Sequence, residues 1–378
     1  MIELSFTTAD PEVRALCERY WRLDETGEFV GTVKAIASDA GLLSAELLQV
    51  VRSGCQATSA DRSCARCGVG VEVTSRSDYK GRPRYRAELC APCQEQERKE
   101  RQAESERQAQ AQRAAIAQTY DYPIPDSPPP EALSLEEAVY LLSIVRAGAS
   151  EDLSYLNRLV DFQTPFTPWV SFDIEAARVL RSAGLIDAHP GSNVNAFVFE
   201  ENAPPSFYIR DVHWRLLIGR SASEVREYLD RLETIFREMD WPESWWEQTT
   251  DLWRLVARYE CLEYLDDRLS EHGIPFEPSD RTLSVIDGLL KSFSVSQVYN
   301  IIWRKVRDAT AFLSRTPAPR ARGADYAVVS MQKYGDQAAA AGWELGKYRR
   351  SWDLPVSMVA EVLYNAVLQL DGFNEVPS

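Results

Sequence analysis

Apolar residues recur at helical spacing over most of the chain, and this pattern predicts a protein built mainly from α-helices. The clearest amphipathic runs lie in the second half of the chain, at residues 221–239, 243–270, 283–290, 295–313, 325–343 and 355–370. Strand-like alternation is confined to a few short segments. We therefore expect a mainly α fold, and a chain of 378 residues is long enough for several domains.

The first 56 residues are also predicted to be helical. Ile36 and Ala37 suit the inside of one helix, and Gly41 lies where a turn requires a positive φ angle. Ser44 can cap a following helix, in which Leu47 and Val50 would face the core. The run from Thr32 to Val51 resembles a helix-turn-helix, although any three-helix domain can produce this pattern.

This resemblance implies that the second helix would face DNA. Its exposed positions would be Ala45, Glu46, Gln49 and Arg52. Only Gln49 and Arg52 are side chains that read base edges well, so they are the candidate groove contacts.

Four of the seven cysteines form two C-x-x-C pairs, Cys64 with Cys67 and Cys90 with Cys93. The 22 residues between the inner cysteines give a spacing typical of a structural zinc site, in which four thiolates complete a closed tetrahedron. Residues 69–74 and 85–89 can form two antiparallel strands around a turn at 75–81. The segment resembles a zinc ribbon, or a treble clef if the following helix packs on it. Reduced buried thiols and a redox pair are the alternatives, and Cys17, Cys55 and Cys261 are expected in the core.

The zinc-binding segment carries a local excess of positive charge. Residues 62–86 contain seven basic and two acidic side chains, within a chain whose net charge is −15. Candidate phosphate contacts are Arg76, Lys80, Arg82, Arg84 and Arg86. The last four alternate in what we call the basic segment, residues 80–86, so an extended backbone would place them on one side. A solvated tip, or a contact with acidic protein surface, is the alternative to nucleic acid.

A polar stretch at residues 94–118 has no apolar stripe and is predicted to form a solvated helix, steadied by i, i+4 ion pairs. Prolines stop it between residues 120 and 132, where we place a linker. Three helices near 135–145, 153–159 and 172–182, followed by strands at 196–200 and 207–210, resemble a winged helix. That resemblance carries no diagnostic motif.

Charge also divides the second half of the chain. Residues 131–302 contain 15 basic and 29 acidic side chains, whereas residues 303–350 contain ten basic and four acidic ones. This basic region is interleaved with aromatic residues, so it is either a second phosphate-binding surface or a surface that docks on the acidic region. Four tryptophans, at 241, 245, 246 and 253, are expected to be core or interface anchors.

The sequence gives little reason to expect an enzyme. The three histidines, His189, His213 and His272, lie in no metal-ligand or catalytic spacing, and no phosphate-binding glycine loop is present. No run reaches the roughly 18 apolar residues of a membrane helix, and the N-terminus does not read as a secretion signal, so a cytoplasmic protein without membrane contact is expected.

These patterns predict five regions: a helix-turn-helix domain (1–56), a zinc ribbon with a trailing polar helix (57–119), a proline-rich linker (120–132), a winged-helix-like domain (133–212) and a helical domain (213–378). The predicted role is that of a non-enzymatic zinc protein that binds nucleic acid, DNA rather than RNA. Residues 133–378 would bind a protein partner or a second copy. The alternative is a protein-recognition adaptor or scaffold subunit in which the zinc site is purely structural.

Overall fold

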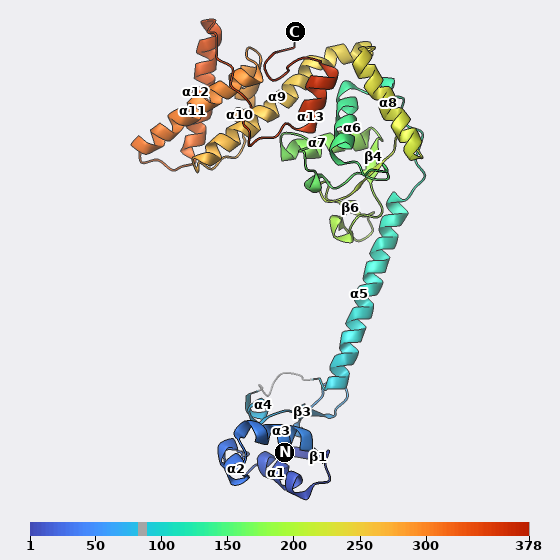
Figure 1. Ribbon diagram of the computed structural model, residues 1–378, viewed down its shortest axis with the longest axis vertical. Coiled ribbons are helices and arrows are strands. Elements are labelled where there is room, and N and C mark those ends of the chain that lie inside the picture. Colours follow the sequence, from blue (N-terminus) through green and yellow to red (C-terminus); the bar gives the residue numbers. More distant parts are fainter. Residues whose placement is uncertain (82–88, 378) are drawn as a thin grey trace. The chain divides into compact units, whose positions relative to one another are not determined.

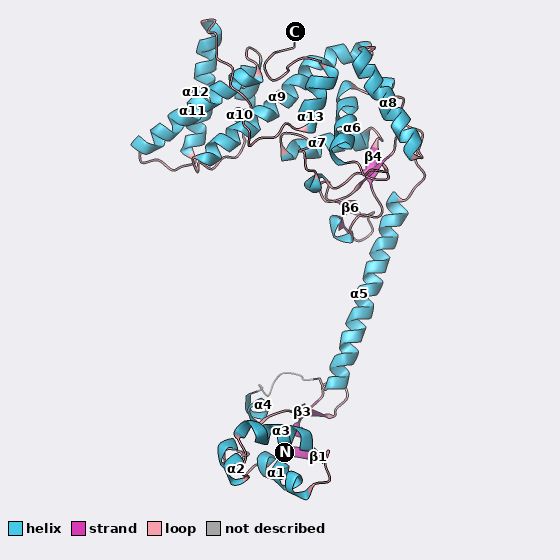
Figure 2. Cartoon of the chain, in the orientation of Figure 1, coloured by secondary structure: helices cyan, strands magenta, loops and turns pink. Residues whose placement is uncertain are grey.

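The computed structural model describes residues 1–81 and 89–377, apart from the side chains of residues 60–62. The chain divides into two compact units, residues 1–110 and 111–378. Helices account for most of each unit, as Figures 1 and 2 show, and the mainly α fold expected from the sequence is confirmed. Within the described residues, no helix is both long enough and apolar enough to cross a bilayer.

The first unit combines four short helices with one small sheet. Its elements are β1 (Ile2–Phe6), α1 (Pro11–Trp21), α2 (Val33–Asp39), α3 (Ser44–Gly54), β2 (Cys55–Ser63), β3 (Gly70–Val73), α4 (Arg76–Gly81) and the first two thirds of α5 (Ala91–Tyr120). Its core is small and includes Cys17, Tyr20, Leu47 and Val51, which come from α1 and α3.

The sheet corrects the expectation that the first 56 residues are entirely helical. Strands β1, β2 and β3 pair antiparallel in that order, with Leu4 opposite Ala57 and Ala57 opposite Val73. In β1, half-buried and exposed positions alternate, which is the two-residue period of a strand. The run is only five residues long, so its period was hidden beside the longer helical patterns.

The helix pair α2 and α3 follows the predicted pattern with two corrections. Ile36 and Ala37 are buried, and Gly41 has a φ angle of +67°. Ser44 is the first residue of α3 rather than its cap, and the Glu46 carboxylate accepts the backbone N–H of Leu43 at 2.8 Å. The buried face of α3 contains Leu47 and Val51 rather than Val50, because residues four apart lie one turn apart on the same side.

The segment between the two cysteine pairs differs from the predicted hairpin. The expected strand at 69–74 is present as β3, but it pairs with β2, which precedes the first cysteine pair. The expected turn at 75–81 is the short helix α4. Residues 85–88 of the second expected strand lie outside the described residues, and Leu89 is not in a strand.

The second unit begins within α5 and contains the larger core. Its helices are α6 (Leu135–Gly148), α7 (Val170–Ser182), α8 (Ala222–Glu238), α9 (Glu243–Glu271), α10 (Asp280–Leu290), α11 (Val295–Arg315), α12 (Arg322–Ala340) and α13 (Met358–Glu361), which continues as a π-helix at Val362–Val367. Short 3₁₀ turns lie at Pro130–Ala132, Leu159–Asp161 and Val194–Ala196. Near the end of α5, Ile116 and Tyr120 are buried in this core.

The region expected to resemble a winged helix keeps only part of the predicted pattern. Helix α6 begins with a capping box of Ser134 and Glu137, and α7 is present. The helix expected at 153–159 is replaced by turns and the 3₁₀ turn at Leu159–Asp161. Its leucines satisfied a helical spacing, but Leu156 instead forms a bridge to Trp214.

The strands of this region are short and nested. Strand β5 (Phe197–Val198) pairs with β6 (Ser206–Phe207), close to the predicted hairpin. Outside them, β4 (Ile186–Ala188) pairs with β7 (Trp214–Leu216), and this pair was not predicted. Each strand is only two or three residues long, which is too short for an alternating pattern to be recognised.

The proline-rich segment 121–132 belongs to the second unit and is held to the rest of that unit by side-chain hydrogen bonds. Tyr122 donates its hydroxyl to Asp187 at 2.7 Å, and Tyr228 donates to the Pro128 carbonyl at 2.8 Å. The division between the compact units lies earlier, between Gln110 and Ala111 within α5.

Three of the four clustered tryptophans belong to the core. Trp241, Trp245 and Trp253 are buried, and the indole N–H of Trp245 donates to the Leu133 carbonyl at 2.7 Å. Trp246 differs, because 51% of its surface is exposed.

Candidate metal centre

The first cysteine pair lies in the tight loop that joins β2 to β3. The Cys64 N–H donates to the Val69 carbonyl at 2.7 Å, and the Gly68 N–H returns to the Cys64 carbonyl at 2.9 Å. Gly68 has a φ angle of +75°, a conformation that other residues rarely adopt. The Arg66 N–H also points to the Cys64 sulfur at 3.4 Å. The loop therefore places the sulfurs of Cys64 and Cys67 on the same side.

The second pair lies at the beginning of α5. Cys90 directly precedes the helix, and its carbonyl accepts the Gln94 N–H at 2.9 Å. Cys93 lies in the first turn, next to Pro92, a residue that suits this position because it needs no hydrogen-bond partner there. The positive end of the helix dipole lies at this point and would stabilise thiolates once a cation is bound.

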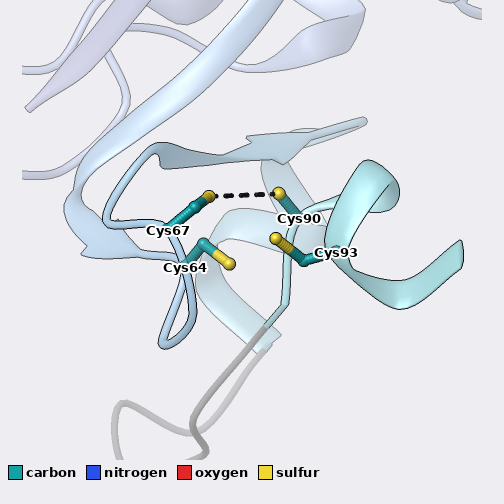
Figure 3. A group of neighbouring side chains, drawn as sticks. All are labelled: Cys64, Cys67, Cys90 and Cys93. Carbon is teal, nitrogen blue, oxygen red and sulfur yellow. Dashed lines mark hydrogen bonds between the residues drawn. The ribbon is translucent and has the colours of Figure 1, made fainter. Parts of the chain in front are cut away.

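The four sulfur atoms of Cys64, Cys67, Cys90 and Cys93 all lie within 4.8 Å of one another. Figure 3 shows the four side chains converging from the hairpin loop and from the start of the helix. The sulfurs of Cys67 and Cys90 are 3.6 Å apart, much farther than a disulfide bond. Tetrahedral zinc with bonds of about 2.3 Å would hold its sulfurs roughly 3.8 Å apart. The donor set and its spacing therefore fit one zinc ion, with no ligand position left for water.

The thiols of the cluster differ in pKa. The backbone N–H of Cys90, followed by those of Cys67 and Arg66, lowers the pKa of the Cys64 thiol to about 6. The hydrogen bond with the Cys90 side chain, together with burial, raises the pKa of Cys93 to about 12. A bound cation requires all four sulfurs as thiolates, so metal binding must release protons.

An ion pair that we did not predict links the two halves of the site. Arg66, between the first two cysteines, donates to both carboxylate oxygens of Glu100 in α5, at 3.0 and 2.6 Å. This bond lowers the pKa of the Glu100 carboxyl. Nearly half of each side chain is exposed, so the pair orients the helix rather than contributing much stability. The only sequence signal was an arginine inside a C-x-x-C pair.

Arg76 was predicted to contact nucleic acid, but the structure buries its side chain. Its side chain is only 7% exposed, and it donates to the carbonyls of Tyr20 and Gly31 at 2.5 and 2.6 Å. Its guanidinium lies over the rings of Tyr20 and Phe29, at 4.8 and 4.6 Å from their centres. Arg76 therefore joins α4 to α1, and its guanidinium makes its contacts inside the first unit.

The other predicted contacts are placed differently. Gln49 and Arg52 are exposed on α3. Lys80 is exposed but pairs with Glu28, a carboxylate of the same unit. Arg82, Arg84 and Arg86 lie outside the described residues.

The remaining cysteines lie apart from the cluster. Cys17, Cys55 and Cys261 are buried, as predicted, and Cys55 belongs to the core of the first unit rather than to the metal centre. Burial raises the pKa of Cys55 to about 12, so it is held as a neutral thiol.

Comparison with family models, with curated proteins and with solved structures gave no match for this chain.

Proposed function

We propose that the first unit is a zinc-stabilised module that binds nucleic acid, and that its role is recognition rather than catalysis. Zinc would be held by Cys64, Cys67, Cys90 and Cys93 and would act structurally, because four thiolates fill its coordination sphere. The arrangement of a hairpin loop and a helix start resembles a treble clef more than a zinc ribbon.

One observation carries this proposal: the four sulfurs converge and so close a loop from residue 68 to residue 89. That loop contains the whole basic segment 80–86. Both ends of this stretch of sequence are joined to the cysteines of the metal centre, so its cations, which suit a phosphate backbone, are attached to the centre at either end. The exposed positions of Gln49 and Arg52 on α3, the second helix of a pair that resembles a helix-turn-helix, would add contacts.

A second candidate function is supported by the way this unit uses its cations. Arg76 is buried, Lys80 is paired with Glu28, and Arg66 is paired with Glu100. These contacts leave fewer cations for phosphate and favour an adaptor whose zinc module binds protein.

Salt dependence distinguishes the two functions. We expect a fluorescent DNA duplex to bind the full chain at 50 mM salt and to lose affinity by roughly 10-fold or more at 200 mM, because binding releases counterions. The variant Arg82→Ala/Arg84→Ala/Arg86→Ala should bind more weakly at both salts. A control that removes two exposed cations of α8, Arg226→Ala/Arg237→Ala, should leave affinity within twofold.

The nucleic-acid proposal fails if zinc-loaded protein binds neither DNA nor RNA at 50 mM salt. It also fails if the triple variant binds as wild type does. A protein partner that is captured equally by both forms would then identify the adaptor.

A further inference from the structure

The segment after α12, residues 341–357, is irregular but firmly attached to the second unit. The Asn300 amide donates to the Gly346 carbonyl at 2.9 Å, and the Tyr348 N–H donates to the Ser296 carbonyl at 2.9 Å. Tyr348 also packs against Trp303 of α11, with ring centres 5.5 Å apart. These contacts fix the course of the segment over α11.

Arg350 provides the deepest attachment. It pairs with Glu260 of α9, a carboxylate that is fully buried. The other oxygen of Glu260 accepts the Tyr364 hydroxyl at 2.7 Å. Among the described residues, no other ion pair joins the basic region 303–350 to the acidic region 131–302.

The side chains that alternate with these anchors point to solvent. Lys347 and Arg349 are exposed and have no ion-pair partner among the described residues. Trp343 is 46% exposed and Trp352 is 91% exposed. On the adjacent helix α11, Arg304 and Arg307 are also exposed, and Arg307 lies over the Trp303 ring at 4.8 Å. We call this set the loop face; it comprises Trp303, Arg304, Arg307, Trp343, Lys347, Arg349 and Trp352.

The loop face combines two features that single-stranded nucleic acid requires. Its cations lie in a region with a net charge of +6, within a chain of −15, so a polyanion is the complementary partner. Trp352 offers an almost fully exposed ring on which an unpaired base can stack, and such a tryptophan is unusual on a surface without a partner. Trp343 packs one edge against Tyr334 but keeps about half of its surface open, whereas Trp303 is already covered by Arg307 and Tyr348 and supports them. An acidic protein would satisfy the cations but would leave the ring faces unused.

We propose that the loop face binds single-stranded nucleic acid by stacking bases on Trp343 and Trp352 and pairing phosphates with Lys347, Arg349, Arg304 and Arg307. The backbone contacts that hold Gly346, Tyr348 and Arg350 keep the segment ordered before the strand arrives. This site belongs to the second unit and goes beyond the proposed function of the first.

The test measures fluorescence anisotropy of a labelled 20-nucleotide oligo(dT) with the full chain. All loop variants are made in the Arg82→Ala/Arg84→Ala/Arg86→Ala background, so that the first unit contributes little. Trp343→Ala/Trp352→Ala should weaken binding about 10-fold or more, because each stacked base contributes strongly. The control Trp246→Ala removes a half-exposed tryptophan of α9 and should change affinity less than twofold.

Charge reversal tests the phosphate contacts separately. Lys347→Glu/Arg349→Glu should weaken binding about 10-fold or more and reduce the salt slope by about 1.4, the value for two contacts on a single strand. Arg226→Glu/Arg237→Glu makes the same charge change on α8 and should have an effect under twofold. The same sequence as a duplex should bind more weakly, because its bases are already stacked on each other.

Three results would overturn the proposal: no oligo(dT) binding at 50 mM salt in the background variant, unchanged affinity in both loop variants, or a duplex bound as tightly as the single strand. Sedimentation of the same proteins tests a second copy as the occupant. If the loop variants disperse a self-associated form while oligo(dT) affinity stays constant, the loop face binds the acidic region of another chain instead. Loss of all binding in the background variant would refute this site and leave the first unit's role intact.

Discussion

Replacing Arg76 by alanine should make the first unit much less stable. The variant should keep its affinity for nucleic acid wherever the unit stays folded, because the Arg76 side chain is buried. The substitution leaves the buried Tyr20 carbonyl without its donor, at a cost of about 1 to 3 kcal/mol, whereas the Gly31 carbonyl belongs to an exposed residue that water can hydrate. It also removes the contact with the rings of Tyr20 and Phe29, which contributes roughly 1 kcal/mol. Together these losses amount to about 2 to 4 kcal/mol.

Calorimetry of the zinc-loaded full chain measures this change directly. For a unit of this size, the expected loss lowers its melting temperature by about 10 °C or more. Hydrogen exchange of peptides from α1 and α3 should accelerate in parallel, because Arg76 joins α4 to α1.

Arg76→Lys is the matched control. It keeps the charge but not the planar group that reaches several carbonyls, so its melting temperature should lie between those of wild type and the alanine variant. The reasoning is refuted if Arg76→Ala melts within about 2 °C of wild type. It is also refuted if the alanine variant loses nucleic-acid affinity at a temperature where it remains folded.

Three further changes test the second unit. Arg350→Ala should destabilise it by about 3 to 5 kcal/mol in urea unfolding, because Glu260 is left as a buried charge without its partner, and Glu260→Gln/Arg350→Met should recover part of that loss; equal stability of all forms would contradict the pair. Burial, reinforced by the charge of Glu260, raises the pKa of Glu263 to about 8, so the folded state holds this proton more tightly than the unfolded state and stability should fall between about pH 4.5 and 8. Glu263→Gln should remove this slope and gain on the order of 4 kcal/mol at pH 8, and an unchanged slope would exclude Glu263 as its source. Trp245→Ala should lower the free energy of unfolding by about 3 to 5 kcal/mol, and Trp246→Ala should lower it by less than about 1 kcal/mol, both measured by urea unfolding. Equal losses would show that burial does not decide the difference.

The cysteine cluster could be predicted from the sequence because its information is local. Each C-x-x-C pair sets its own geometry, once by a glycine turn at Gly68 and once by the start of α5. Only the distance in space between the two pairs depends on the fold. The 22 residues between the pairs are a spacing typical of a structural zinc site, so this distance could also be expected to be short. The long helices α8, α9 and α11 were predicted close to their observed ends for the same reason, since each carries its own periodic apolar face.

What the sequence did not predict depends on partners distant along the chain. Strand β1 exists because it pairs with β2, whose residues lie 49 to 57 positions later in the chain. Arg76 looked like a surface cation because nothing local indicates that the carbonyls of Tyr20 and Gly31 would surround it. Leu153, Leu156 and Leu159 had helical spacing, yet the bridge from Leu156 to Trp214 replaced the helix. In each case a tertiary contact overrode a plausible local pattern.

Zinc K-edge X-ray absorption of the purified full chain, with the metal-to-protein ratio measured on the same sample, tests the metal centre most directly. We predict one zinc per chain, bound by four sulfur atoms at about 2.3 Å, and loss of that signal in Cys64→Ser/Cys90→Ser. A metal-free chain, or zinc bound mainly through nitrogen and oxygen, would contradict the centre on which the proposed role of the first unit depends.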